Sequence, residues 1–149
     1  MRRFLLWGLL GGLLGGGAGC LDPGAPFLAP RDTDPPDVIS TEPSVGGVVA
    51  TDGALQVLFS EAMDVRTLRP GMAVFEGRAE VPLTLKVPPE PTGEAAEEHG
   101  DVPYTVSVSP ESGTWKAGSA YTLVLRTSLT DVEGNALGQE VRVPFRTPP

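Results

Sequence analysis

The chain has 149 residues with a formal net charge of −8, and it includes 19 glycines, 16 prolines and one cysteine. This length fits one domain, the negative charge disfavours nucleic acid as a partner, and one cysteine excludes an internal disulfide or a multi-cysteine zinc site. The many glycines and prolines favour short strands joined by turns over long helices, which predicts an all-β fold.

The first twenty residues have the three-part layout of a secretory signal peptide. Arg2 and Arg3 precede an uncharged run over residues 4–14, and small residues follow that run up to Cys20. The uncharged run is shorter than the roughly 20 residues that a membrane-spanning helix needs. We therefore predict a signal peptide over residues 1–19 and export from the cytoplasm.

Residues 14–20 resemble the bacterial lipobox, in which small residues precede a cysteine that carries lipid such as palmitate. Gly17, Ala18 and Gly19 stand directly before Cys20. The resemblance implies a lipoprotein with Cys20 as its lipidation site and the membrane as a partner, and cleavage that leaves a free thiol is the alternative. Leu21 is not the aspartate associated with inner-membrane retention, which favours the outer membrane or the cell surface.

A proline-rich segment follows the cysteine. Five prolines lie between residues 21 and 37, and proline favours extended, poorly packed chain because it fixes φ and supplies no hydrogen-bond donor. We expect a tether over residues 20–36 and the folded domain over residues 37–149.

Alternation of apolar and polar residues in the remaining chain predicts β-strands. The segments that alternate are 55–59, 81–85, 104–108, 121–125 and 141–145, with shorter candidates at 38–41 and 72–75. About seven strands are typical of an Ig-like β-sandwich. Pro82 and Pro144 indicate that their strands lie at sheet edges, and no segment has the pattern of an amphipathic helix.

Several of these segments resemble a known family in order and spacing. The most specific are LQVLFSEAMD at residues 55–64 and DVEGNAL at 131–137, supported by residues 34–43, 118–125 and 143–147. Together they resemble the SbsA-type bacterial Ig-like domain over residues 34–149. The resemblance implies a β-sandwich of the kind found in bacterial surface and secreted proteins, where such domains are often repeated as spacers or adhesion modules.

Oxygen-bearing side chains gather in two predicted turns and have two interpretations. The candidates for a calcium site are Glu61, Asp64, Asp131 and Asn135. Calcium binds six to eight oxygen ligands, but Asp and Asn also accept or donate hydrogen bonds in tight turns, and Gly134 can adopt a positive φ. The residues favour the turn interpretation, so we predict no metal or other cofactor.

Residues 86–101 form the one long stretch without core periodicity, and we interpret them as an acidic loop. Its candidate binding residues are Glu90, Glu94, Glu97, Glu98 and His99. Long loops on rigid sandwiches often carry binding specificity, although a solvated insertion explains the same composition.

Two aromatic residues have expected roles within the sandwich. Tyr121 resembles the corner tyrosine of Ig-like folds, whose hydroxyl bonds to an upstream backbone group. For Trp115 we favour a plug at the end of the core, and a platform that stacks on a sugar is the alternative.

Motifs for enzymatic chemistry are missing from the chain. It has no GxSxG, P-loop or HExxH motif, and His99 is its only histidine. We therefore predict a non-catalytic, lipid-anchored extracytoplasmic Ig-like module that binds a partner or serves as a spacer. A carbohydrate-binding or adhesion module is the alternative, and an assembly subunit that pairs through an edge strand is a further one; the partner would be an unknown protein or polysaccharide.

Overall fold

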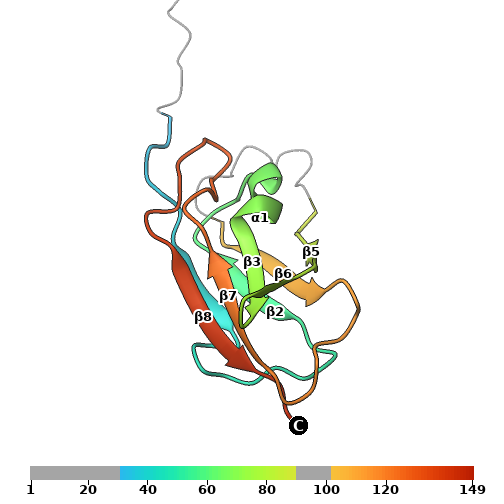
Figure 1. Ribbon diagram of the computed structural model, residues 1–149. Helices are drawn as coiled ribbons and strands as arrows, with labels where there is room; N and C mark the ends of the chain where they lie inside the picture. Colours follow the sequence, from blue (N-terminus) through green and yellow to red (C-terminus); the bar gives the residue numbers. More distant parts are fainter. Residues whose placement is uncertain (1–30, 90–101) are drawn as a thin grey trace, which may run out of the picture. The chain divides into compact units, whose positions relative to one another are not determined.

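The computed structural model describes residues 31–89 and 102–149, which form two antiparallel four-stranded sheets (Figure 1). In the first sheet the order is β1 (Val38–Glu42), β2 (Leu55–Phe59), β6 (Tyr104–Pro110) and β5 (Leu83–Lys86). In the second sheet it is β4 (Ala79–Val81), β3 (Met72–Glu76), β7 (Ala120–Leu125) and β8 (Val141–Arg146). The predicted Ig-like β-sandwich is confirmed, while residues 1–19 and most of the expected tether lie outside the described residues.

Alternate residues of the central strands fill the space between the two sheets. In the first sheet, Leu55 lies opposite Val108 and Val57 opposite Val106, so one face of this strand pair is entirely apolar. The buried set drawn from both sheets includes Leu55, Val57, Phe59, Val106, Val108, Leu123, Leu125, Val143 and Phe145. Burial of each large apolar side chain contributes about 1.5–3 kcal/mol, so the alternation seen in the sequence supplies the main stabilisation of the fold.

The segment predicted as one strand over residues 81–85 is divided by Pro82, so the described residues contain eight strands where about seven were expected. β4 ends at Val81 in one sheet, and β5 begins at Leu83 in the other. Proline has no N–H to donate to a neighbouring strand. Pro82 therefore fits the position at which the chain passes from one sheet to the other. The prediction that strands with Pro82 and Pro144 lie at edges is confirmed, because β4, β5 and β8 are all edge strands.

A short helix, α1 (Val65–Gly71), occurs where no helix was predicted. Asp64 caps its first turn by accepting the N–H of Arg66, and Leu68 is buried under it. The helix ends against the core, where a Cβ on Gly71 would lie 2.5 Å from the Leu129 side chain. Seven residues are too few to show helical periodicity. Within residues 31–89 and 102–149, no helix combines the length and apolar character needed to cross a membrane.

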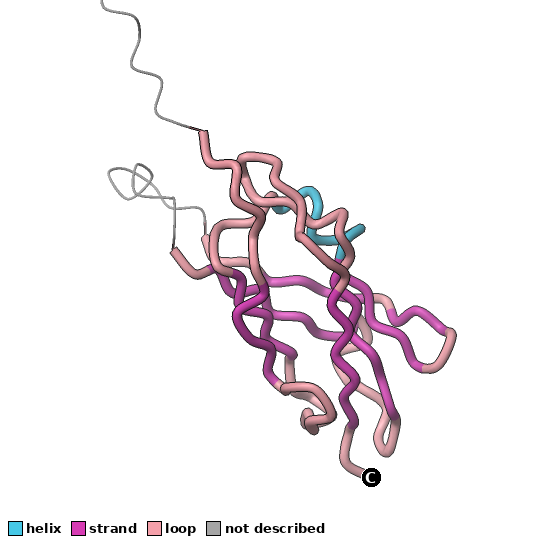
Figure 2. The backbone as a smooth tube through the Cα atoms, turned by 90° about the vertical axis from the view of Figure 1, so that its left-hand side faces the viewer, coloured by secondary structure: helices cyan, strands magenta, loops and turns pink. Residues whose placement is uncertain are grey.

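The N-terminal segment (residues 31–37) and the C-terminus lie at opposite ends of the sandwich, as Figures 1 and 2 show. We call the first end the N-terminal pole. There the N–H of Asp37 donates to Ser60 Oγ over 2.9 Å, and the N–H of Ser60 donates to the Asp37 carbonyl over 2.9 Å. At the other end, the C-terminal pole, the N–H of Gly118 donates to the carbonyl of Pro148 over 2.8 Å.

Candidate functional site

Three carboxylates meet at the N-terminal pole. Asp32, Glu61 and Asp131 each place one oxygen within 4.8 Å of the other two. Asp131 is fully buried and Glu61 is 8% exposed. We call this set the carboxylate cluster; among the described residues it is the group whose geometry could hold a metal ion.

Two loops that cross-link to each other position the cluster. Glu61 lies between β2 and α1, whereas Asp131 lies between β7 and β8. The two loops are joined by a bridge between Met63 and Asp131 and by the N–H of Asp64, which donates to the Thr130 carbonyl over 2.9 Å. The segments after β2 and after β7 therefore meet at the pole where the N-terminal segment lies.

Asp131 is the centre of a tight turn. Its Oδ1 accepts the backbone N–H of Asn135 over 2.8 Å, and its Oδ2 accepts the Asn135 side-chain amide over 2.7 Å. Gly134 has a φ of 94°, in the region that favours glycine. Both carboxylate oxygens of Asp131 are thus already hydrogen-bonded within the turn, as the turn interpretation expects.

The same turn holds the N-terminal segment in place. The Asn135 amide also donates to the Asp32 carbonyl over 3.2 Å, and the Arg31 guanidinium donates to the Glu133 carbonyl. Asp32 Oδ1 accepts the N–H of Asp34 over 2.9 Å. Residues 31–36, which the composition assigned to the tether, therefore already contact the sandwich, and Pro36 is buried.

The four calcium candidates from the sequence do not form one group. Glu61 and Asp131 come together, Asp32 joins them, and Asn135 directs its amide hydrogens toward Asp131. Asp64 lies outside the cluster and pairs with Arg66, whose Nη2 is 2.7 Å from Asp64 Oδ2. Sequence reasoning missed Asp32 because it lies among prolines, and the only signal was its position just before the domain.

Hydrogen bonds with Arg66 lower the pKa of Asp64 from its ordinary value. The side-chain bond is the main cause, and the backbone N–H of Arg66 adds to it. The same carboxylate caps α1, so Asp64 has a structural role at the start of the helix.

Chemically, the cluster could attract a divalent cation, because three carboxylates concentrate negative charge in one place. The hydrogen bonds provide another account, since the oxygens of Asp131 hold Asn135 in the turn and the Asn135 amide links the turn to the N-terminal segment. Calcium would need six to eight oxygens, more than the three carboxylates contribute with one oxygen each. The arrangement therefore favours a structural role.

The predicted binding residues Glu90, Glu94, Glu97, Glu98 and His99 lie outside the described residues. The chain on either side of them is described. Lys86 pairs with Ser107, and Tyr104 pairs with Phe59 next to the Asp37–Ser60 contact. Both ends of the acidic loop therefore lead to the N-terminal pole.

Trp115 is a core plug, as predicted. It is 3% exposed, and its Nε1 donates to the Gly53 carbonyl over 2.7 Å. Its ring centroid lies 5.3 Å from that of Tyr121 and 5.4 Å from that of Phe145. The ring is therefore not accessible for stacking on a sugar.

Tyr121 makes the predicted corner contact. Its hydroxyl accepts the backbone N–H of Lys116, five residues upstream, over 2.9 Å. Its ring also stacks on Phe145. The residue therefore fixes the β6–β7 connection to the core.

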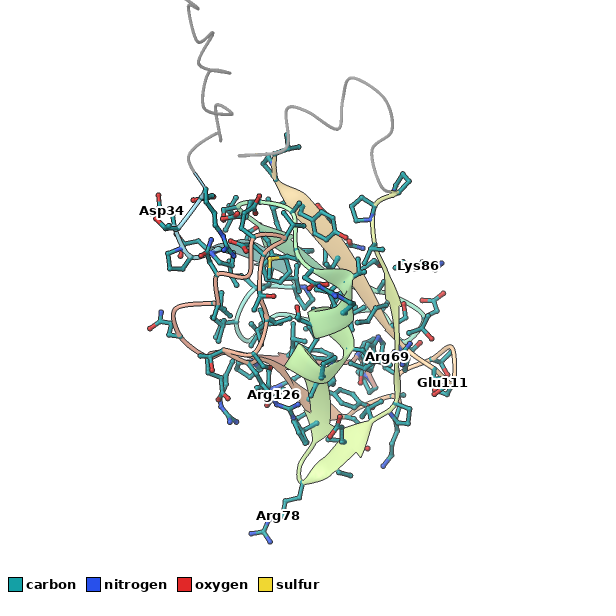
Figure 3. The ribbon with its side chains drawn as sticks, turned by 90° about the horizontal axis from the view of Figure 1, so that it is seen from above. Asp34, Arg69, Arg78, Lys86, Glu111 and Arg126 are labelled. Atoms are coloured by element: carbon teal, nitrogen blue, oxygen red, sulfur yellow. The ribbon has the colours of Figure 1, made fainter. Side chains whose placement is uncertain are left out.

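Two open hollows lie on the surface of the described unit. One hollow, of about 350 Å³, lies at the crossover between β4 and β5, and its lining includes Arg69, Pro82 and Glu111. Figure 3 shows Arg69 and Glu111 on the same side of the molecule. The other, of about 400 Å³, is lined by residues that include Thr122, Pro144 and Arg146. Neither lining contains a histidine, cysteine or serine.

Comparison with known proteins gives the family. The chain matches the bacterial Ig-like domain family over residues 32–147. Among solved structures, it is similar to the N-terminal part of the bacterial S-layer protein SbsC, with a TM-score of 0.48 and 20% identity, over 77% of this chain and 24% of that one. A longer structure of the S-layer protein rSbsC gives a TM-score of 0.45 and 20% identity, over 76% of this chain and 14% of that one.

The chain thus spans about a quarter or less of the S-layer proteins that it matches. No curated protein matches it. The family match covers most of the chain and includes all the described strands. The protein belongs to the bacterial Ig-like domain family.

Proposed function

We propose that this protein is a lipid-anchored extracytoplasmic module at the cell surface. Its SbsA-type Ig-like domain binds a partner or serves as a spacer. The observation that carries the proposal is the position of Cys20. It ends a leader-like sequence and precedes the first described residue of the domain, Arg31, by only eleven positions. Each CH₂ group of an acyl chain that is buried in the membrane contributes about 0.8 kcal/mol to binding. Several acyl chains on Cys20 would therefore hold the domain at a bilayer.

The absence of a catalytic role is part of the same proposal. It is supported by the family and by the two hollows, whose linings contain no histidine, cysteine or serine. The carbohydrate-binding alternative requires an exposed aromatic platform, and the burial of Trp115 counts against it. We therefore favour a protein partner or a spacer role over a polysaccharide partner.

The outer membrane or the cell surface is the proposed location. The resemblance to SbsA-type domains implies a bacterial surface or secreted protein, and Leu21 follows the proposed anchor cysteine. The net charge of −8 would discourage the domain from lying against anionic lipid, so the lipid on Cys20 would provide the attachment.

Lipid labelling tests the anchor directly. We expect the full chain, expressed in a bacterium that processes lipoproteins, to incorporate radiolabelled palmitate and to fractionate with membranes. Cys20→Ser should abolish both, because the thiol that accepts the lipid is gone.

A relocated thiol provides the matched control. Cys20→Ser combined with Ser44→Cys restores one cysteine at an exposed position in the β1–β2 loop. This variant should remain unlabelled. Equal labelling of the native chain and of Cys20→Ser, or no label in either, would refute lipid anchoring at Cys20.

A further inference from the structure

The larger hollow, of about 400 Å³, lies on the outward face of the sheet that contains β7 and β8. Tyr121 and Phe145 point into the core, so the residues that alternate with them on these strands point outward. The outward residues that line the hollow are Ala120, Thr122, Pro144 and Arg146. Gly46 and Gly77 also line it, and a Cβ on either would meet no atom within 4 Å. The hollow is therefore open to a ligand from outside.

The surface beside the hollow is mostly apolar, whereas the solvated face of an antiparallel sheet usually carries polar side chains. Thr122 pairs with Pro144 in the ladder between β7 and β8. At the edge of the sheet, Val48 forms a bridge with Arg146 and is 63% exposed. Val45, which directly precedes Gly46 of the lining, is 68% exposed. Exposed apolar groups that lie together are typical of interaction surfaces.

The charge at the hollow is positive, although the chain as a whole has a net charge of −8. The lining includes Arg146 and contains no aspartate or glutamate. Arg78 directly follows Gly77 of the lining, and its side chain extends away from the body of the domain in Figure 3. Two cations therefore border a hollow that offers them no carboxylate.

Most basic side chains of the described residues are already engaged. Those that form a salt bridge or donate to a backbone carbonyl are Arg31, Arg66, Arg69, Lys116, Arg126 and Arg142. The basic side chains that have neither within residues 31–89 and 102–149 are Arg78, Lys86 and Arg146. Two of these three border the same hollow, which leaves that hollow with charge to bind an anionic ligand.

We propose that this hollow binds an extended acidic segment of a partner protein in which an apolar and an acidic side chain are two residues apart. Residues two apart on an extended chain share a face, as Pro144 and Arg146 do on β8. A segment with the same spacing can place its apolar side chain on Pro144 and its carboxylate at Arg146, whose guanidinium can donate two parallel hydrogen bonds to it. The inference rests on the binding role within the proposed function, and it does not depend on the anchor at Cys20.

Two observations favour this ligand over others. An acidic polysaccharide would supply carboxylates but no apolar side chains for Pro144, Val45 and Val48. The smaller hollow does not have the same charge, because its lining contains Glu80 and Glu111 and its arginine, Arg69, already donates to the Leu83 carbonyl.

Amide chemical shifts of the isotope-labelled full chain in dodecyl maltoside micelles test the proposal. The probe is the capped peptide GSLSESG, in which leucine and glutamate share a face, and the control peptide GSLSQSG lacks the charge. We expect the probe to shift the amides of Gly46, Ala120 and Thr122 with millimolar affinity, and the control to bind about fivefold more weakly, as loss of one exposed ion pair allows. No shift at these amides, or equal binding of both peptides, would overturn the proposal.

Substitution of the free cations provides matched variants. Arg146→Gln and Arg78→Gln should each weaken binding of the probe by up to about fivefold. Lys86→Gln removes an exposed cation without a described partner from the other sheet, and it should leave binding unchanged. If Lys86→Gln weakened binding as much as Arg146→Gln, only the net charge would matter and the hollow would not be the site. Unchanged amide shifts in the core verify that each variant is folded.

Polygalacturonate tests the other class of anionic ligand, because it carries carboxylates without apolar side chains. We expect it to shift the lining amides no more than the control peptide does. A stronger response that Arg146→Gln abolished would assign the hollow to an acidic polysaccharide and overturn the protein partner. Palmitate labelling of Cys20 is measured separately, so a failure at the hollow and a failure of the anchor are distinguishable.

Discussion

At the scale of single residues, Asp131 is the most deeply buried charged side chain in the described part of the chain. It is fully buried within a cluster of three carboxylates, yet both of its oxygens accept hydrogen bonds from Asn135. A buried carboxylate is costly unless it is hydrogen-bonded, and the turn supplies that compensation. The Asn135 amide that Asp131 holds in place also donates to the Asp32 carbonyl, which connects the β7–β8 loop to the N-terminal segment.

We expect Asp131→Asn to lower the free energy of unfolding by about 2 kcal/mol, because hydrogen bonds to a charged group contribute about 1.5–3 kcal/mol. The new amide would direct N–H groups at the N–H groups of Asn135. Urea unfolding of residues 31–149 measures the loss. Asp34→Asn removes the same charge from an exposed side chain and should change the stability by less than about 0.5 kcal/mol.

The turn interpretation also predicts the response to calcium. Millimolar calcium should leave the melting temperature of the native domain unchanged, since the oxygens of Asp131 already serve Asn135. A rise of several degrees that Asp131→Asn abolished would contradict this expectation and identify the cluster as a cation site.

At the scale of elements, α1 depends on its cap, because a helix of seven residues has little intrinsic stability. Asp64→Ala should cost about 1 kcal/mol through loss of the cap. Asp64→Asn keeps a capping side chain and should cost less. Urea unfolding of both variants beside the native domain separates the cap from the charge.

The pH dependence isolates the charge of Asp64. Its pKa is lowered in the folded protein, so its charged form stabilises the fold above the ordinary value of 3.8, and the contribution disappears as the pH falls through the lowered pKa. The stability difference between the native domain and Asp64→Asn should therefore shrink in acid. A difference that stays constant from neutral to acidic pH would show that the pair with Arg66 does not matter.

The strands were predictable from the sequence because burial on one face of a sheet leaves a period of two, as in residues 55–59 and 121–125. That period does not report which sheet a strand joins. Residues 81–85 therefore read as one strand, although Pro82 divides them between the two sheets. Helix α1 was missed because one cap and one buried leucine make a weaker pattern than a full amphipathic stripe.

The candidate site was harder to predict than the strands, because it is assembled from segments far apart in the chain. Asp32, Glu61 and Asp131 come from three segments, and their meeting depends on the bridge between Met63 and Asp131. Local turn chemistry identified Asp131 and Asn135 correctly as a turn. It could not indicate that Asp32 would join them or that Asp64 would face Arg66.

At the scale of the whole molecule, each of the four edge strands carries a feature that discourages pairing with another sheet. β1 has an irregular register between Val38 and Ser40, β4 has three residues, and the guanidinium of Arg69 donates to the Leu83 carbonyl on β5. The fourth edge, β8, is covered by residues 46–49. The described unit therefore favours a monomer over the edge-paired assembly.

The cover on β8 consists of backbone hydrogen bonds. The N–H of Gly46 donates to the Pro144 carbonyl over 2.7 Å, and the N–H of Arg146 donates to the Gly47 carbonyl over 3.0 Å. A Cβ on Gly47 would lie 2.6 Å from the Pro43 Cβ, so a side chain there would push the loop away from β8. A Cβ on Gly138 would meet no atom within 4 Å, and the φ of Gly138 is not positive, which makes this glycine a matched control.

Light scattering coupled to size exclusion tests this account of the edges on the chain that starts at Arg31. The native domain and Gly138→Val should both elute as monomers. Gly47→Val should form dimers or larger species, because the exposed edge of β8 offers unpaired N–H and C=O groups to a second copy. A dimeric native domain would favour the assembly alternative. If Gly47→Val remained a monomer, the loop over residues 46–49 would not be what protects this edge.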